Sequence, residues 1–168
     1  MTAQLAERLF VDGRELALCA EPLEPYLASL PERPRFHRPA SALKRGYVGT
    51  WRLSKQRLYL DAIVARLADG SEATLHTLFP NEHQAVFAFW FSGVLRIPQG
   101  RMLAYVHRGF ESTFESDLLY TCQQGVVVSK QVQKNGKSDR PGAPTGYAIG
   151  GMTVFADPPA GGKPPQAS

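Results

Sequence analysis

Residues 86–132 read VFAFWFSGVLRIPQGRMLAYVHRGFESTFESDLLYTCQQGVVVSKQV, and this stretch decides the fold. It is the most apolar and most aromatic part of the chain. It begins within a continuous apolar run, residues 85–91, which predicts an element buried on both faces. Residues 94–97 predict a short strand that ends at Pro98-Gln99-Gly100. Residues 101–108 then predict a central strand, because both of its alternating faces are fairly apolar.

The second half of this stretch predicts a hairpin. A polar connection over residues 109–116 leads to a strand at 117–123. Gln124-Gly125 is a turn signal, and residues 126–132 return as a second strand. Apolar and polar residues are mixed along that last strand, which favours a place at the edge of the sheet.

Strand and helix signals also occur before residue 50. Residues 9–11 and 16–18 flank an Asp-Gly pair and predict a small hairpin. Residues 21–30 have apolar side chains at spacings of three and four, which predicts a short helix. Residues 31–39 contain three prolines and predict an extended surface connection.

Residues 47–79 predict a three-stranded antiparallel meander. Its strands are residues 47–53, 57–67 and 73–79, with turn signals at Ser54–Gln56 and at Asp69-Gly70. Together these patterns predict a mostly β fold: an antiparallel, strongly curved sheet or open barrel with a short N-terminal helix.

The chain of 168 residues has the length of one domain. We expect that domain to span residues 1–133. Residues 134–168 contain seven glycines and six prolines, which predicts a partly disordered tail. Within it, the apolar residues 147–155 are expected to dock as a strand.

Cysteine usage and apolar runs limit the class of protein. Cys19 and Cys122 are far apart and have no partner at metal-ligand spacing, so we expect two reduced thiols in the core. No apolar run is long enough to cross a bilayer, and the N-terminus lacks the features of a signal peptide. These observations favour a soluble cytoplasmic protein.

Charge is distributed unevenly along the chain, although the net charge is only +4. Residues 1–30 contain five acids and two bases, whereas residues 31–60 contain eight bases and one acid. Two interpretations stay open: an acidic or polyanionic partner, or two complementary segments packed together. Within the basic segment, residues 31–39 are read as a solvated loop in preference to a binding arm.

Two sequence elements resemble those of a bacterial family that has no established activity. The first is R-G-Y-x-x-T-W at residues 45–51. The second is L-R-I-x-x-G-x-x-L-x-Y-V-H-x-G-x-x-S-x-x-E-x-D-L at residues 95–118. The resemblance covers roughly residues 40–132 and implies no reaction.

Polar side chains gather near the second element, namely His107, Arg108, Glu111, Glu115 and Asp117. With Arg96 on a neighbouring strand they would form one charged patch. An ion pair from Arg96 to Glu115 or Asp117 that bridges two strands is favoured over acid–base catalysis. The histidines are scattered, so we assign no catalytic residue, no metal ligand and no cofactor.

We therefore expect a small binding or interaction protein, of an immunity or accessory type, with a protein partner, rather than an enzyme. The candidate binding residues are Arg45, Trp51, Arg96, Tyr105, His107, Glu111, Glu115 and Asp117. One alternative is a small-ligand or hydrolase-like pocket walled by Trp51, Tyr105, His107 and Glu115. A second, less favoured alternative is a single-stranded nucleic-acid binder that uses the basic residues 33–57 and the aromatics among them.

Overall fold

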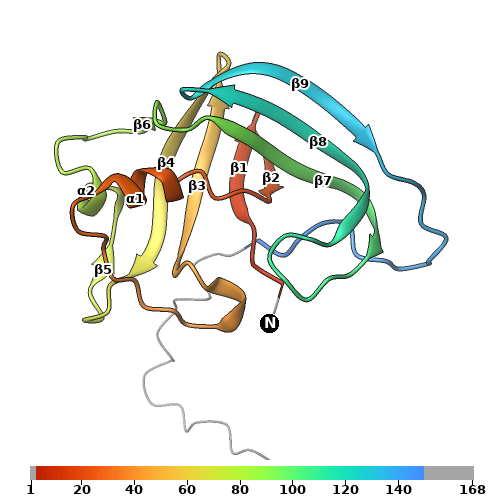
Figure 1. The fold of residues 1–168 in the computed structure, drawn as a ribbon, viewed down its shortest axis with the longest axis horizontal. Helices are drawn as coiled ribbons and strands as arrows, with labels where there is room; N and C mark the ends of the chain where they lie inside the picture. Colours follow the sequence, from red (N-terminus) through yellow and green to blue (C-terminus); the bar gives the residue numbers. More distant parts are fainter. Residues whose placement is uncertain (1–2, 150–168) are drawn as a thin grey trace, which may run out of the picture.

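The computed structural model describes residues 3–149, which form a mostly β structure with three short helical segments (Figure 1). The strands are β1 (Glu7–Val11), β2 (Arg14–Leu18), β3 (Tyr47–Ser54), β4 (Arg57–Arg66), β5 (Glu72–Ala73), β6 (Val86–Phe87), β7 (Gly93–Ala104), β8 (Thr113–Gln123) and β9 (Val126–Lys134). The helical segments are α1 (Glu24–Ser29), α2 (Leu75–Leu78) and the 3₁₀ turn η1 (Ser41–Leu43). The predicted fold class and the short N-terminal helix are confirmed.

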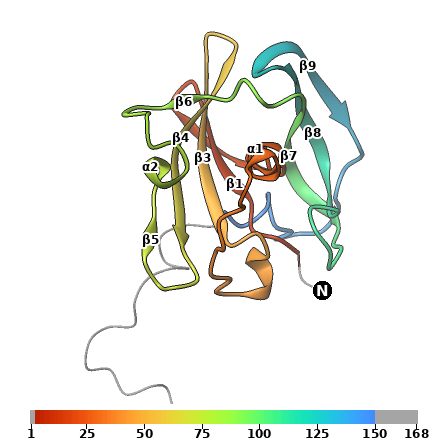
Figure 2. The same ribbon diagram turned by 60° about the vertical axis from the view of Figure 1, so that its left-hand side comes forward.

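The strands form one sheet in the order β2-β1-β3-β4-β9-β8-β7, and β5 and β6 also pair with β4. Every pair is antiparallel except β1 and β3, which run parallel with Leu9 opposite Trp51. The sheet is therefore mixed, which corrects the expectation of a purely antiparallel one. It curves strongly, so that the two ends of the strand order approach each other (Figures 1 and 2). There, the Cys19 N–H donates to the carbonyl oxygen of Arg96 at 2.8 Å, but no ladder joins β2 to β7.

The core lies inside the curve of this sheet. Side chains from β1, β3, β4 and β7 meet there, among them the fully buried Leu9, Trp51 and Leu95. Helix α1 contributes Leu27 and covers one opening of the curve (Figure 2). Cys19 and Cys122 are both buried and free, as the sequence predicted.

Residues 73–79 do not form the predicted third strand of a meander. Only the two residues of β5 pair with β4, and the chain then turns into α2. Thr74 and Thr77 form a capping box, in which each side chain bonds to the backbone of the other residue. These two hydrogen bonds give backbone N–H groups at the start of α2 local acceptors, which favours a helical turn over a longer strand.

The apolar run 85–91 is not an element buried on both faces. Only β6 pairs with β4, after which the chain turns and leaves Phe89 61% exposed. The turn is fixed by tertiary contacts, because the Trp90 indole N–H donates to the carbonyl oxygen of Pro22. Apolar composition alone could not predict that contact.

Residues 94–97 and 101–108 do not form two strands, because β7 is continuous through most of this region. A register shift between Gln99 and Met102 bends β7, and Gly100 adopts a φ of +79° there. β7 ends the strand order, so it is not a central strand. The predicted edge character of the last strand holds for most of β9, which meets β4 only at Val126.

Part of the predicted tail contacts the sheet. Ile149 forms a parallel bridge with Ala6, and the Tyr147 hydroxyl accepts a hydrogen bond from the Ser112 N–H. The remainder of the predicted strand at 147–155 lies outside the described residues. The division into a domain and a partly disordered tail stays a prediction.

Candidate anion-binding site

A buried carboxylate, Glu7, organises the first half of the sheet. It lies on β1 and shares the inward face with Leu9, and it has no exposed surface. One of its oxygens, Oε2, accepts from the Gly49 N–H at 2.6 Å and from Arg45 Nη2 at 3.0 Å. The other, Oε1, accepts from the Trp51 indole at 3.4 Å. Glu7 thus receives three donors from one short segment.

That segment is RGYVGTW, residues 45–51, and it wraps around Glu7. A Cβ atom at Gly49 would lie 2.5 Å from the Trp51 indole nitrogen and 2.9 Å from Glu7 Oε1, so only glycine fits there. Tyr47 is also fully buried, and its hydroxyl donates to Glu24 Oε1 at 2.8 Å. The RGYVGTW segment therefore encloses a buried carboxylate.

The charge on Glu7 is balanced by its donors. Burial raises the pKa of Glu7, while the Arg45 guanidinium and the Gly49 N–H act in the opposite direction. A carboxylate is an acceptor-only group, and three donors at its two oxygens match the ionised form. We therefore treat Glu7 and Arg45 as a buried ion pair.

Arg45 has more donors than this pair uses. Its side chain is only 3% exposed, and its guanidinium carbon lies over the rings of Tyr47 and Phe110, 5.6 and 6.0 Å from their centroids. Its Nε and Nη1 are buried and have no hydrogen-bond acceptor among the described residues. The carboxylate of Glu21 lies 4.0 Å from Nη1, beyond hydrogen-bonding distance.

A basic arm, residues 31–39, runs beside Arg45. Its backbone is pinned to the end of β4, where the His37 N–H donates to the Arg66 carbonyl and the Ala68 N–H donates to the Arg35 carbonyl, both at 2.8 Å. The ring of Phe36 packs on Tyr47 with a centroid distance of 5.5 Å. The arm is therefore an extended surface connection, as predicted, but it is held in a fixed position.

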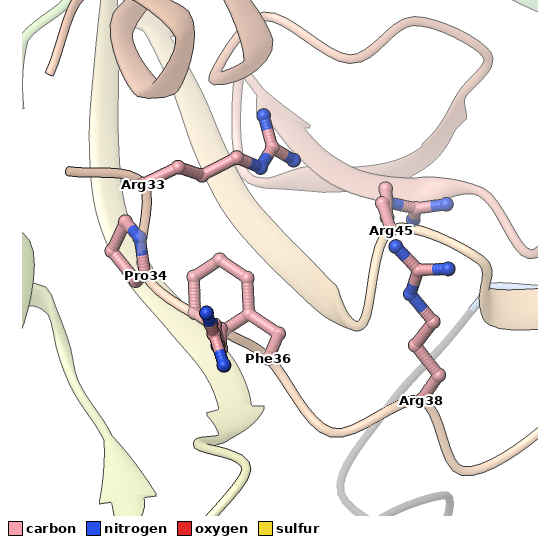
Figure 3. Close-up of a pocket in the computed structure, with 6 residues that line it drawn as sticks. Arg33, Pro34, Phe36, Arg38 and Arg45 are labelled. Atoms are coloured by element: carbon pink, nitrogen blue, oxygen red, sulfur yellow. The ribbon is translucent and has the colours of Figure 1, made fainter.

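Between the basic arm and Arg45 lies a pocket of about 430 Å³, which we call the arginine pocket (Figure 3). Its lining residues are Arg33, Pro34, Arg35, Phe36, Arg38 and Arg45, with no acid among them. Figure 3 shows the Arg38 side chain rising from the arm with its guanidinium turned toward Arg45. An adjoining pocket of about 410 Å³ shares Arg33, Arg38 and Arg45, and its wall includes Glu21 and Glu24.

The arginines of the pocket differ in how their charge is balanced. Arg33 forms a two-pronged pair with Glu24 at 2.8 and 3.0 Å. These bonds, together with the one from Tyr47, hold the pKa of Glu24 below its ordinary value although burial acts the other way. Arg35 and Arg38 are exposed and form no ion pair with any residue between 3 and 149. The pocket therefore carries unbalanced positive charge.

The charged patch predicted around Arg96 is a structural network. Arg96 Nε bonds to Asp117 Oδ1 at 2.9 Å, so Asp117 rather than Glu115 is its ion-pair partner. The same guanidinium donates to the carbonyl oxygens of Phe110 and Ser112 at 2.6 and 2.9 Å. Glu115 instead accepts from the backbone N–H groups of residues 101 and 138, which hold its pKa below the ordinary value. These bonds fix the connection between β7 and β8.

The other predicted site residues are not brought to one place. Tyr105 and His107 are exposed, and their rings contact each other edge to face at 4.4 Å. Glu111 is also exposed and pairs with Arg108. Trp51, by contrast, is enclosed in the core. The hypothetical pocket walled by Trp51, Tyr105, His107 and Glu115 is therefore not formed, because its tryptophan faces Glu7.

Across the described residues, no three His, Cys, Asp or Glu side chains are grouped so that they could hold a metal ion.

Sequence reasoning singled out Arg45 but missed Glu7. The sequence predicts a strand from residue 9, whereas β1 begins at Glu7. Because side chains alternate along a strand, an earlier start would have placed Glu7 on the same face as Leu9. An acidic side chain on the inward face of a sheet requires a buried partner. That requirement would have indicated a buried basic or hydrogen-bonding group opposite Glu7.

Comparison of the chain with protein-family models, with curated proteins and with solved structures finds no match in any of the three. Within residues 3–149, no helix is long and apolar enough to cross a membrane.

Proposed function

We propose that this chain is a binding protein that recognises an acidic partner protein through the basic arm and the arginine pocket. The observation that carries the proposal is a pocket lined by four arginines and no acid, at a backbone segment pinned to the sheet. Recognition of one dedicated partner is typical of immunity or accessory proteins.

The charge and chemistry of this surface support an acidic partner. Two of the four guanidinium groups, those of Arg35 and Arg38, are exposed without an ion pair between residues 3 and 149. Arginine is enriched at protein interfaces because its planar group bonds to carboxylates in a two-pronged geometry. A basic patch also speeds the encounter with an acidic surface.

Anchoring of the arm supports the same conclusion. Binding by a mobile segment costs the entropy of ordering it, so a segment that is already fixed binds more tightly per contact. The arm is held by two backbone hydrogen bonds to the end of β4 and by the packing of Phe36 on Tyr47. Its arginines are therefore presented from a rigid base.

The two alternatives have less support. A single-strand nucleic-acid platform requires accessible aromatic rings for stacking with bases. Tyr47 and Trp51 are fully buried, which leaves only the partly buried Phe36 in the basic segment. A small-ligand or hydrolytic site near His107 and Glu115 would require side chains that converge on one place. The Glu115 carboxylate instead accepts hydrogen bonds from two backbone N–H groups.

The test is a pull-down from the native host with three forms of the tagged protein. These are the wild type, the arm variant Arg35→Glu/Arg38→Glu, and the control variant Arg14→Glu/Lys55→Glu. All four substituted residues are exposed, and both variants change the net charge equally. We expect the wild type and the control to retain a stoichiometric acidic protein that the arm variant loses.

Retention of the same protein by the arm variant would contradict the proposal, as would the absence of any stoichiometric partner. Recovery of nucleic acid in place of protein, sensitive to nuclease and to salt, would favour the nucleic-acid alternative.

A further inference from the structure

Arg45 has a charged donor set that residues 3–149 leave incomplete. A guanidinium has five N–H donors, of which Nε and Nη1 supply three. In Arg45 these two nitrogens are buried and have no acceptor among the residues described. Leaving a buried charged donor without an acceptor is costly, so native structures rarely do so without a reason. An acceptor from outside residues 3–149 would complete this donor set.

The surroundings of Arg45 limit where such an acceptor can lie. The guanidinium carbon lies over the rings of Tyr47 and Phe110, within 6.0 Å of their centroids, and Nη2 is bound to Glu7. Arg45 also lines the arginine pocket. Because Nε and Nη1 are themselves buried, an acceptor that enters this pocket reaches them only after the side chains that cover them move.

Two further guanidinium groups stand at the same pocket. Arg38 forms no ion pair between residues 3 and 149, and Figure 3 shows it turned toward Arg45. Arg33 stands on another side and is held in place by Glu24. Donors that surround a pocket from several directions match a tetrahedral oxyanion, whereas a planar carboxylate is satisfied by a single arginine. Unbalanced positive charge also favours a dianion.

We infer that the arginine pocket binds a phosphate monoester group, with Arg45 as the buried anchor and Arg38 as the exposed second contact. This inference rests on the proposed function, because it names the group that a partner would place in the same surface. A phosphorylated side chain and a small phosphorylated metabolite share this chemistry. The pocket volume of about 430 Å³ exceeds that of a phosphate and leaves room for part of the group attached to it.

Glu21 is the internal competitor for this site. Its carboxylate lies 4.0 Å from Arg45 Nη1, one of the two free donors. Burial raises the pKa of Glu21, and the neighbouring Glu24 adds to that effect. A phosphate group would meet repulsion from Glu21, so removal of this charge should tighten binding.

The test is a titration of the purified chain at constant ionic strength with phenyl phosphate, dimethyl phosphate and acetate. Binding is followed by calorimetry and by the NMR signal of the Arg45 Nε–H group, which burial protects from exchange with water. We expect phenyl phosphate to bind most tightly and to shift the Arg45 signal. Equal binding of all three anions, or binding that leaves the Arg45 signal unmoved, would overturn the inference.

Three variants test which side chains bind phenyl phosphate in this titration. Arg38→Gln should weaken binding of phenyl phosphate by about tenfold or more, because it removes a charge-assisted hydrogen bond. Arg14→Gln, an exposed arginine that lines neither pocket at Arg45, is the matched control and should leave the affinity unchanged. Glu21→Gln should tighten binding about two- to fivefold. Equal loss of affinity in Arg38→Gln and Arg14→Gln would indicate general charge attraction and would refute the site.

Two ligands distinguish the sources of the phosphate group, namely a phosphoserine peptide and glucose 6-phosphate. Tighter binding of either one supports the inference and identifies the kind of molecule. The proposed function is tested separately by the pull-down. Phosphate binding without a protein partner would refute only that function, and an arm-dependent partner without phosphate binding would refute only this inference.

Discussion

At the scale of single residues, the protein is organised around a buried ion pair. Taking Glu7 and Arg45 out of water costs free energy that their mutual attraction only partly offsets. Two further donors to Glu7, the Gly49 N–H and the Trp51 indole N–H, reduce the cost of burying this charge. The pair fixes a guanidinium at the base of a pocket.

Removal of one partner of this pair should be strongly destabilising. We expect Glu7→Gln to lower the free energy of unfolding by about 3–5 kcal/mol, because it leaves the Arg45 charge buried without a counter-ion. Chemical denaturation followed by tryptophan fluorescence measures the change. The matched control is Glu15→Gln, which breaks the exposed pair with Arg8 at 2.9 Å and should cost less than about 1 kcal/mol. Equal effects of the two substitutions would contradict the assigned role of Glu7.

At the scale of elements, the basic arm is positioned by a glycine. Gly46 adopts a φ of +77°, and a Cβ atom there would lie 2.7 Å from the Cβ of Phe36 and 2.9 Å from the carbonyl oxygen of His37. A side chain at position 46 would therefore push the arm away from the sheet. In the RGY segment, Gly46 therefore allows the close approach of the arm, whereas Arg45 pairs with Glu7.

Gly46→Ala should consequently affect both stability and recognition. Strain at a positive φ and the contact with the arm should together cost more than about 1 kcal/mol of unfolding free energy. The arm should also move, so that affinity for the acidic partner falls while the distant sheet is unchanged. Amide NMR shifts confined to residues 33–40 and 45–49, with weaker partner binding, are the expected readout. Unchanged shifts in the arm would show that Gly46 does not position it.

The elements that the sequence predicted well are those with local signals. The Asp-Gly and Gln-Gly turns marked two hairpins, and the spacing of Leu23, Tyr26 and Leu27 marked α1. Residues 73–79 and 85–91 were mispredicted because their conformation depends on a local capping box and on the bond from Trp90 to Pro22. Apolar periodicity is insensitive to both kinds of contact.

At the scale of the whole molecule, curvature of the sheet brings together residues that are remote in sequence. Glu7 and Arg45 lie 38 positions apart, and Cys19, which directly follows the end strand β2, bonds to Arg96 on the other end strand, β7. The candidate site depends on such non-local contacts, so the sequence predicted its basic character and Arg45 but neither Glu7 nor the pocket. The parallel pairing of β1 with β3 was missed for the same reason.

The same curvature encloses both thiols, which gives a prediction about their chemistry. Burial raises the pKa of Cys19 to about 12 and that of Cys122 to about 11. A neutral buried thiol is a poor nucleophile, so neither cysteine should react with a thiol reagent at about pH 8 until the chain unfolds. Both should react in denaturant. Because the unfolded chain ionises its thiols at lower pH, stability should also fall as the pH rises above about 9. Rapid labelling of the native protein would contradict the assigned core.

A crystal structure of the protein grown with phenyl phosphate tests the arginine pocket most directly. We expect a phosphate group in the arginine pocket. One oxygen should lie about 2.7–3.2 Å from Nη1 or Nε of Arg45, and another within the same range of Arg38. The Glu7–Arg45 pair should be unchanged beneath it. An empty pocket, with the free donors of Arg45 bonded to Glu21 instead, would show that Arg45 does not anchor a phosphate group.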